Sequence, residues 1–219
     1  MKKWFKKTVA VVLTAAMAMT VGIPAFAADS EVELAATKAQ ANEKIAEFMM
    51  DSDSFLAALN QVSAQEVSSS TWNLRERQEV RELTLDNGIT ITNTRTITKT
   101  TENSKNIEDE FGFQYAGIPG ALGSIVAEYE YYYETIDGPN QMKTMLVDAG
   151  GYAKNLDTNY YRFTDADGHF DGASSYNETA SVDFYMQFFT STLLGWEDIE
   201  YTHTCTFDKY GSYTMQWLG

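Results

Sequence analysis

The segment 89–101 constrains the fold of this chain most strongly, because its side chains alternate without a break. Every second residue from 90 to 100 is threonine, and isoleucine, asparagine, arginine and lysine fill the positions between. A period of two places these two sets on opposite faces of a β-strand. An Asp-Asn-Gly sequence at 86–88 separates this segment from the run 81–85, which is typical of a β-hairpin.

Other segments extend this expectation to most of the chain. Residues 160–170 are interpreted as a second hairpin, with its turn at 165–168, and the polar, acidic residues 102–110 are expected to form a loop. The further strand candidates alternate or are continuously apolar, and they lie at 125–134, 141–148, 181–189, 199–207 and 212–217. Short turns between such strands predict a mostly antiparallel meander.

Two helices are expected before the strands. A capping-box sequence from Ser30 to Glu33 and an apolar stripe at helical spacing predict a helix over about 31–50. An N-cap sequence at 51–54 and a second stripe predict a shorter helix over about 54–63. The predicted fold is therefore α+β, with one or two N-terminal helices packed on a curved, mostly antiparallel β-meander of about eight or nine strands.

Residues 1–27 have the organisation of a secretory signal, in a style typical of bacteria. A lysine-rich start precedes an uncharged apolar run at 8–22, and Ala25 and Ala27 are the small residues that a signal peptidase requires. We expect cleavage after Ala27 and secretion. An uncleaved anchor helix is the alternative, although the apolar run is short for a bilayer span. No cysteine for a lipid anchor and no wall-sorting tail are seen.

The expected secreted chain, residues 28–219, is predicted to be a single domain with a helical part (28–65) and a β-rich part (68–219). Four of the 16 Lys and Arg residues, and none of the 31 Asp and Glu residues, lie before it, so its net charge is −19. Nucleic-acid partners are excluded, because phosphate contacts need clustered basic residues. Cys205 is the only cysteine, so no internal disulfide can form.

No catalytic constellation emerges, and we expect a non-enzymatic protein without a cofactor. His203 and Cys205 would share a strand face, but their parallel side chains would lie about 6–7 Å apart, so a core role is expected. Asp165, Asp167 and Asp171 could offer oxygen ligands to calcium, yet the EF-hand spacing fails and a hairpin turn uses the same residues. No metal is predicted, and metal binding by these aspartates is left open.

The leading functional prediction is a binding protein that uses an aromatic face of the sheet. Such a face offers apolar area with polar tips, which suits an apolar small molecule, a glycan or a protein partner outside the cell. The alternative is that this face packs on the N-terminal helix, and both can hold together. The layout resembles secreted half-barrel carriers of lipids and lipoproteins in architecture alone. The predicted binding residues are Tyr129, Tyr131, Tyr133 and Trp217.

The alternative function is a secreted membrane-active or antibacterial protein. The strand 89–101 resembles the Ser- and Thr-rich strands with which secreted pore-forming toxins line a barrel. The uncharged, glycine-rich segment 111–127 would be the membrane-seeking piece, unless it is a loop tucked over the core. Arg95 and Lys99 oppose this alternative, because they lie on the face that would meet lipid. Its membrane-contacting residues would be Phe111, Phe113, Ile118, Leu122 and Ile125.

Overall fold

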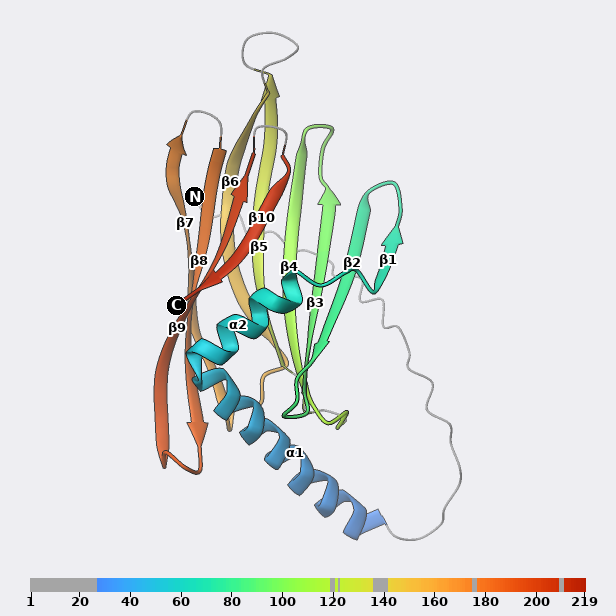
Figure 1. Ribbon diagram of the computed structural model, residues 1–219, viewed down its shortest axis with the longest axis vertical. Coiled ribbons are helices and arrows are strands. Elements are labelled where there is room, and N and C mark those ends of the chain that lie inside the picture. The colour runs from blue at the N-terminus through green and yellow to red at the C-terminus, as the bar shows by residue number, and fades with distance from the viewer. Residues whose placement is uncertain (1–26, 119–120, 122, 136–141, 175–176, 209–210) are drawn as a thin grey trace, which may run out of the picture.

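Two helices precede two antiparallel sheets in this computed structural model, which describes residues 27–118, 121, 123–135, 142–174, 177–208 and 211–219 (Figure 1). The helices are α1 (Ala27–Met50) and α2 (Ser52–Ser63). The first sheet is a meander of β1 (Ser69–Trp72), β2 (Glu76–Thr84), β3 (Ile89–Lys99), β4 (Ser104–Tyr115), β5 (Gly123–Thr135) and β6 (Met142–Lys154). The second contains β7 (Tyr161–Ser174), β8 (Asn177–Thr190), β9 (Gly195–Phe207) and β10 (Tyr213–Leu218). The α+β meander is confirmed, but it is divided into two sheets and has ten strands among the described residues.

The two sheets enclose one core. Rings from the first sheet contact rings from the second, as in the pair Tyr131 and Phe207, whose centroids lie 4.6 Å apart. The sheets approach most closely where β6 meets β7. A Cβ atom at Gly168 would lie 1.9 Å from the carbonyl oxygen of Ala149, so a residue without a side chain is required there.

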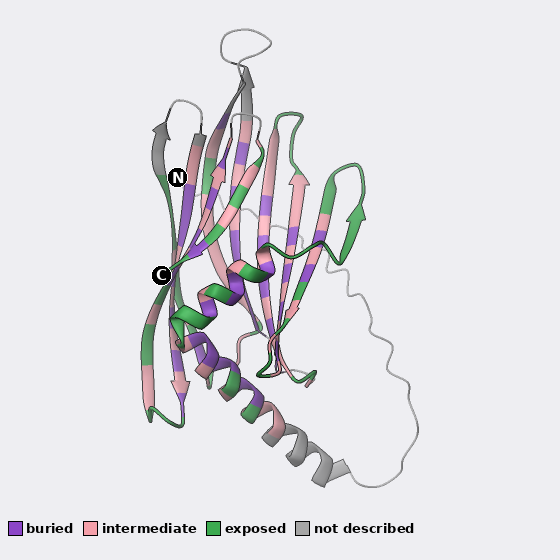
Figure 2. Cartoon of the chain, viewed as in Figure 1, coloured by how far each residue is buried: buried purple, intermediate pink, exposed green. Residues whose placement is uncertain are grey.

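The helices cover the side of the core that the strands leave open. α2 contacts β2, β3 and β10, while α1 contacts β4 and β8. The side-chain amide of Asn60 donates to the carbonyl oxygen of Trp217 at 3.0 Å and accepts from its N–H at 2.9 Å. Asn60 thus bonds the outer edge of β10 as a residue of a neighbouring strand would. Figure 2 shows buried positions on the parts of α1 and α2 that face the sheets.

The predicted hairpin at 81–101 is confirmed. β2 pairs with β3, and Gly88 in the connecting turn has a φ of +84°, a conformation that glycine adopts at no steric cost. The threonines of β3 are half-exposed on its outer face. On the inner face, Ile89, Ile91, Asn93 and Arg95 are buried. The alternation therefore separates the two faces as expected.

Three local predictions are wrong. α1 begins at Ala27, so the capping-box sequence at Ser30 does not start it. The predicted loop 102–110 is mostly strand, because β4 begins at Ser104 and its inward Asp109 has buried partners. Residues 165–168 do not turn but lie within β7, after a bulge that follows Phe163.

Among the described residues, no helix is both long and apolar enough to cross a bilayer.

Candidate functional site

The predicted aromatic binding residues lie in the core wherever the structure describes them. Tyr129 and Tyr131 are buried, and the ring of Tyr129 packs against His203 with centroids 5.7 Å apart. Trp217 is also buried, with its ring 5.2 Å from that of Phe111. The side chain of Tyr133 lies outside the described residues. These rings contact other protein side chains, and ligand binding by them stays a prediction.

The predicted membrane-contacting residues are also mostly internal. Phe111, Phe113 and Ile125 are buried, and Ile118 is half-buried in the turn after β4. Leu122 lies outside the described residues. Residues 111–115 of this segment therefore belong to β4 and residues 123–127 to β5, so these parts are strands rather than a loop over the core.

The candidate metal ligands that the structure describes lie on the surface, whereas the histidine and cysteine candidates lie in the core. Asp165 and Asp167 are exposed on β7, and the side chain of Asp171 is outside the described residues. Across the described part of the chain, no group of three or more His, Cys, Asp or Glu side chains could hold a metal ion. His203 and Cys205 are buried, as predicted. Burial raises the pKa of the Cys205 thiol well above its usual value, so the thiolate form is suppressed.

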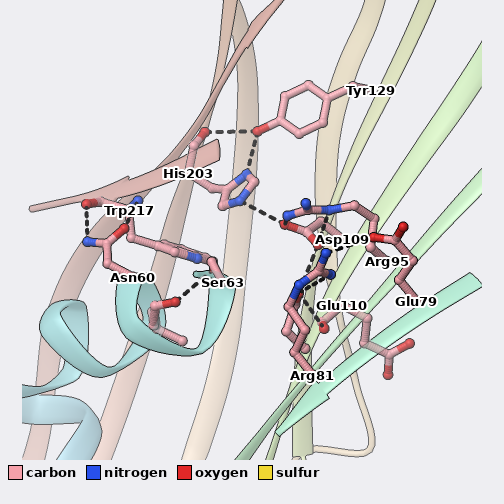
Figure 3. Close-up of polar contacts among 12 residues, drawn as sticks. Asn60, Ser63, Glu79, Arg81, Arg95, Asp109, Glu110, Tyr129, His203 and Trp217 are labelled. Atoms are coloured by element: carbon pink, nitrogen blue, oxygen red, sulfur yellow. Dashed lines mark hydrogen bonds and ion pairs between the residues drawn. The ribbon is translucent and has the colours of Figure 1, made fainter. Parts of the chain in front are cut away.

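A buried charged network crosses the interior between β3, β4 and β9 (Figure 3). Arg95 donates from Nε and Nη2 to the two carboxylate oxygens of Asp109, at 3.1 and 3.0 Å. Asn93 donates to the same carboxylate at 2.8 Å. Nε2 of His203 lies 3.2 Å from Asp109, within ion-pair distance but not aligned for a hydrogen bond. Asp109 is thus the centre of the network.

Further contacts extend the network to β2 and β5. Arg81 donates to Glu79 at 2.7 Å and approaches Asn93 at 3.5 Å. The hydroxyl of Tyr129 lies 2.6 Å from Nδ1 of His203 and donates to the carbonyl oxygen of that residue at 3.0 Å. The network therefore links four strands of the first sheet to β9 of the second.

The pKa of Asp109 records how strongly these partners act. Burial alone would raise this pKa, but the charge of Arg95 and the contact with His203 outweigh burial and hold it well below its usual range. The carboxylate therefore stays ionised, and the same pairing raises the pKa of Arg95 although burial would lower it.

Acid, imidazole and phenol groups in contact are the side chains of general acid–base catalysis. Asp109 and His203, however, are fully buried, and Tyr129 is nearly so. A substrate cannot contact these groups in this conformation. The network is therefore a structural element of the core, and its inward polar residues Asn93 and Arg95 were the sequence signal for it.

An open cleft lies where the two helices meet the end of the first sheet. The helices join at an angle between Met50 and Ser52 (Figure 1). The cleft has a volume of about 620 Å³, within the usual range for small-molecule sites. Its apolar lining comes from α1, α2, the end of β4 and the β2–β3 turn region, namely Phe48, Ala57, Ala58, Leu85, Ile89 and Tyr115.

Polar and charged side chains surround this apolar lining. They are Lys44, Glu47, Asp51, Ser54, Gln61, Asp86 and Asn87.

Lys44 donates to Glu47 at 2.7 Å, and this hydrogen bond raises the pKa of Lys44. The rim therefore presents both a fixed cation and carboxylates beside an apolar surface. The sequence predicted the N-cap at Asp51 and the turn at 86–88 separately, but it held no signal that these two features meet.

The cleft combines an apolar surface with convergent polar groups, which is the usual composition of a ligand site. No model of a known protein family matches the chain, and no curated protein or solved structure shows significant similarity to it.

Proposed function

We propose that this protein is a secreted, non-enzymatic binding protein whose ligand site is the cleft between α1, α2 and the β2–β3 turn. The observation that carries the proposal is the 620 Å³ cleft with an apolar lining and a charged rim. This composition suits a small molecule with an apolar body and a polar end. Binding was the leading expectation from the sequence, and the cleft supports the proposal better than the buried tyrosines do.

The position of the cleft supports this proposal. Some of its lining residues are anchored in the core and others are open to solvent. Phe48, Ala58 and Ile89 are buried, whereas Ala57 is exposed on α2. Gly88, with its positive φ, would place a Cβ only 3.6 Å from the ring of Tyr115. The turn therefore lies beside Tyr115, which lines the cleft.

The alternative function, membrane activity through 89–101 and 111–127, ranks second. β3 is paired on both sides, with β2 and β4, and the predicted lipid-facing residues Phe111, Phe113 and Ile125 are buried. A pore would require these residues to leave the core, at a cost set by the apolar area they bury.

The test is a titration of residues 28–219 with the neutral apolar dye N-phenyl-1-naphthylamine. We expect a saturable rise in dye fluorescence. Ala57→Trp should abolish it, because the indole would fill the cleft from an exposed position without disturbing the core. Ala64→Trp is the matched control, since Ala64 is exposed just after α2 and does not line the cleft.

Two outcomes of the dye titration would contradict the proposal. An Ala57→Trp variant with unchanged circular dichroism that binds the dye as the parent does would remove the cleft from consideration. Equal loss in the Ala57→Trp and Ala64→Trp variants would show binding elsewhere on α2. Either outcome contradicts the proposed site.

A further inference from the structure

The end of the first sheet opposite the cleft carries the most exposed apolar side chains of its strands. Trp72 is 79% exposed at the end of β1, and Leu74 is 99% exposed in the β1–β2 turn. Such large apolar groups usually gain from a partner that removes them from water. We name Trp72, Leu74, Arg75, Arg77 and Lys99 the basic tip.

The backbone of the basic tip is held in a fixed shape. Asn73 accepts hydrogen bonds through Oδ1 from the N–H groups of Arg75 and Glu76, at 2.9 and 2.8 Å. The N–H of Lys99 donates to the carbonyl oxygen of Arg75 at 2.7 Å, which joins the turn to the end of β3. Trp72 and Leu74 are therefore presented by an ordered turn, which lowers the entropy cost of docking.

The two turns at this end carry a local charge opposite to that of the whole chain. Residues 72–77 and 99–105 contain four basic and two acidic side chains, whereas the chain from residue 28 has a net charge of −19. Arg75 and Lys99 are exposed, and Arg77, also exposed, pairs with Glu79. The average charge of the chain therefore does not describe these two turns.

We propose that the basic tip docks the protein on the surface of an anionic phospholipid bilayer. Tryptophan is favoured at the boundary between headgroups and acyl chains, and an adjacent leucine adds apolar burial. Each exposed Arg or Lys near an anionic surface adds about 1 kcal/mol of attraction. A bilayer surface offers a place for Trp72 and Leu74 as well as for the cations, and an acidic protein surface is distinguished from it by the test below.

The docked orientation leaves the cleft accessible. β2 runs from the basic tip to the turn at 86–88, and its nine residues span about 30 Å. The ligand site would therefore face away from the bilayer. This inference does not depend on the proposed function, because the two sites share no residue.

The test uses residues 28–219 with vesicles of phosphatidylglycerol and phosphatidylcholine, compared with phosphatidylcholine alone. This chain has only three tryptophans, at 72, 196 and 217, and Trp72 is the most exposed of them. Docking predicts a blue shift of tryptophan fluorescence and quenching by brominated lipids with anionic vesicles only. Trp72→Phe should abolish both signals while vesicle sedimentation continues.

Binding itself is measured by vesicle sedimentation of matched variants. We expect Leu74→Ser and Arg75→Glu each to weaken partitioning about tenfold at low salt, and the second effect to shrink as salt screens the charge. Leu194→Ser is the control, because Leu194 is 86% exposed in the β8–β9 turn, outside the basic tip.

Three results would overturn the inference. They are no binding of the parent to anionic vesicles, equal loss in Leu74→Ser and Leu194→Ser, and lipid-independent self-association that the tip variants abolish. The last would make an acidic surface of a second copy the partner. In each case the dye titration of the cleft still reports on the proposed function.

Discussion

The inner faces of the two sheets differ in chemistry although they enclose one core. In the second sheet, the buried inward residues of 180–188 and 201–207 are aliphatic, aromatic or sulfur-containing, apart from His203. The first sheet places polar and charged groups inward on three neighbouring strands, namely Glu79, Arg81, Asn93, Arg95 and Asp109. His203 is the point where the second sheet meets this charged network.

The two sheets are therefore specified in different ways. A buried ion pair adds little net stability compared with well-packed apolar residues, but one unpaired member is very costly. Arg95 and Asp109 are directly opposite in the β3–β4 register, so slippage by one residue would separate them. We infer that charge pairing fixes the register of the first sheet, whereas side-chain shape fixes that of the second.

The largest expected effect is that of Asp109→Ala. The substitution leaves Arg95 buried without its carboxylate, so the free energy of unfolding in urea should fall by about 3–5 kcal/mol. The control is Asp183→Ala, because Asp183 is half-exposed on β8 and accepts a hydrogen bond from Thr202. The free energy of unfolding of Asp183→Ala should fall by about 1 kcal/mol.

A double variant sharpens this result. Arg95→Met with Asp109→Leu removes both charges and should recover most of the stability lost in Asp109→Ala. If the double variant is as unstable as Asp109→Ala, the cost arises from packing and the comparison between the sheets fails.

The second prediction concerns pH. The pKa of Asp109 is lower in the folded protein than in the unfolded chain, so its contribution to stability is complete above the unfolded value of about 4. The contribution is lost progressively as the pH falls below about 4, because the unfolded chain then binds a proton that the folded protein does not. Urea unfolding between pH 3 and 6 should show a steeper decline for the parent than for Asp109→Asn, and parallel curves would contradict this assignment.

The third prediction concerns the neutral polar contacts of the second sheet, which should matter less than the charged network. Asn60→Ala removes both side-chain bonds to the backbone of Trp217. The free energy of unfolding should fall by about 2 kcal/mol. Gln61→Ala, at an exposed neighbour on α2, should leave it unchanged within about 0.5 kcal/mol. A loss in Asn60→Ala larger than in Asp109→Ala would reverse the comparison.

The smallest effect is expected at the β2–β3 turn. Gly88→Ala forces a side chain into a positive φ and should cost about 1 kcal/mol. Gly150→Ala is the control, because no atom lies within 4 Å of the added Cβ and its φ is ordinary. If the network fixes the register, β2–β3 amide exchange should remain protected in Gly88→Ala. Loss of that protection would assign the register to the turn.

The sequence predicted the elements whose alternation is uninterrupted. β3 and β9 each have one outward threonine-rich face and one inward face, and both were recognised. Strand β4 was not predicted over 104–110, because an aspartate at 109 is typical of a loop. Its inward position is explained by Arg95 on the neighbouring strand, which pairs with it. Polar residues that pair across strands conceal the hydrophobic period.

The prediction of a turn at 165–168 was wrong for a related reason. Aspartate and glycine are typical of turns, but here the aspartates are exposed on a strand and Gly168 allows β7 to approach Ala149. The cleft was also beyond the sequence, because its walls come from elements far apart in the chain. Local patterns predict each wall but not the distance between walls.

The contact between Asn60 and β10 has a consequence for the solubility of the protein. An outer strand with free N–H and C=O groups is a template on which another chain can add a strand. By bonding Trp217 from the side, α2 blocks that template within the molecule. Detachment of α2 would therefore expose a pairing edge, and strand exchange between copies would rise with protein concentration. The Asn60 contact therefore occupies the outward N–H and C=O groups of Trp217 as well as attaching the helix to the core.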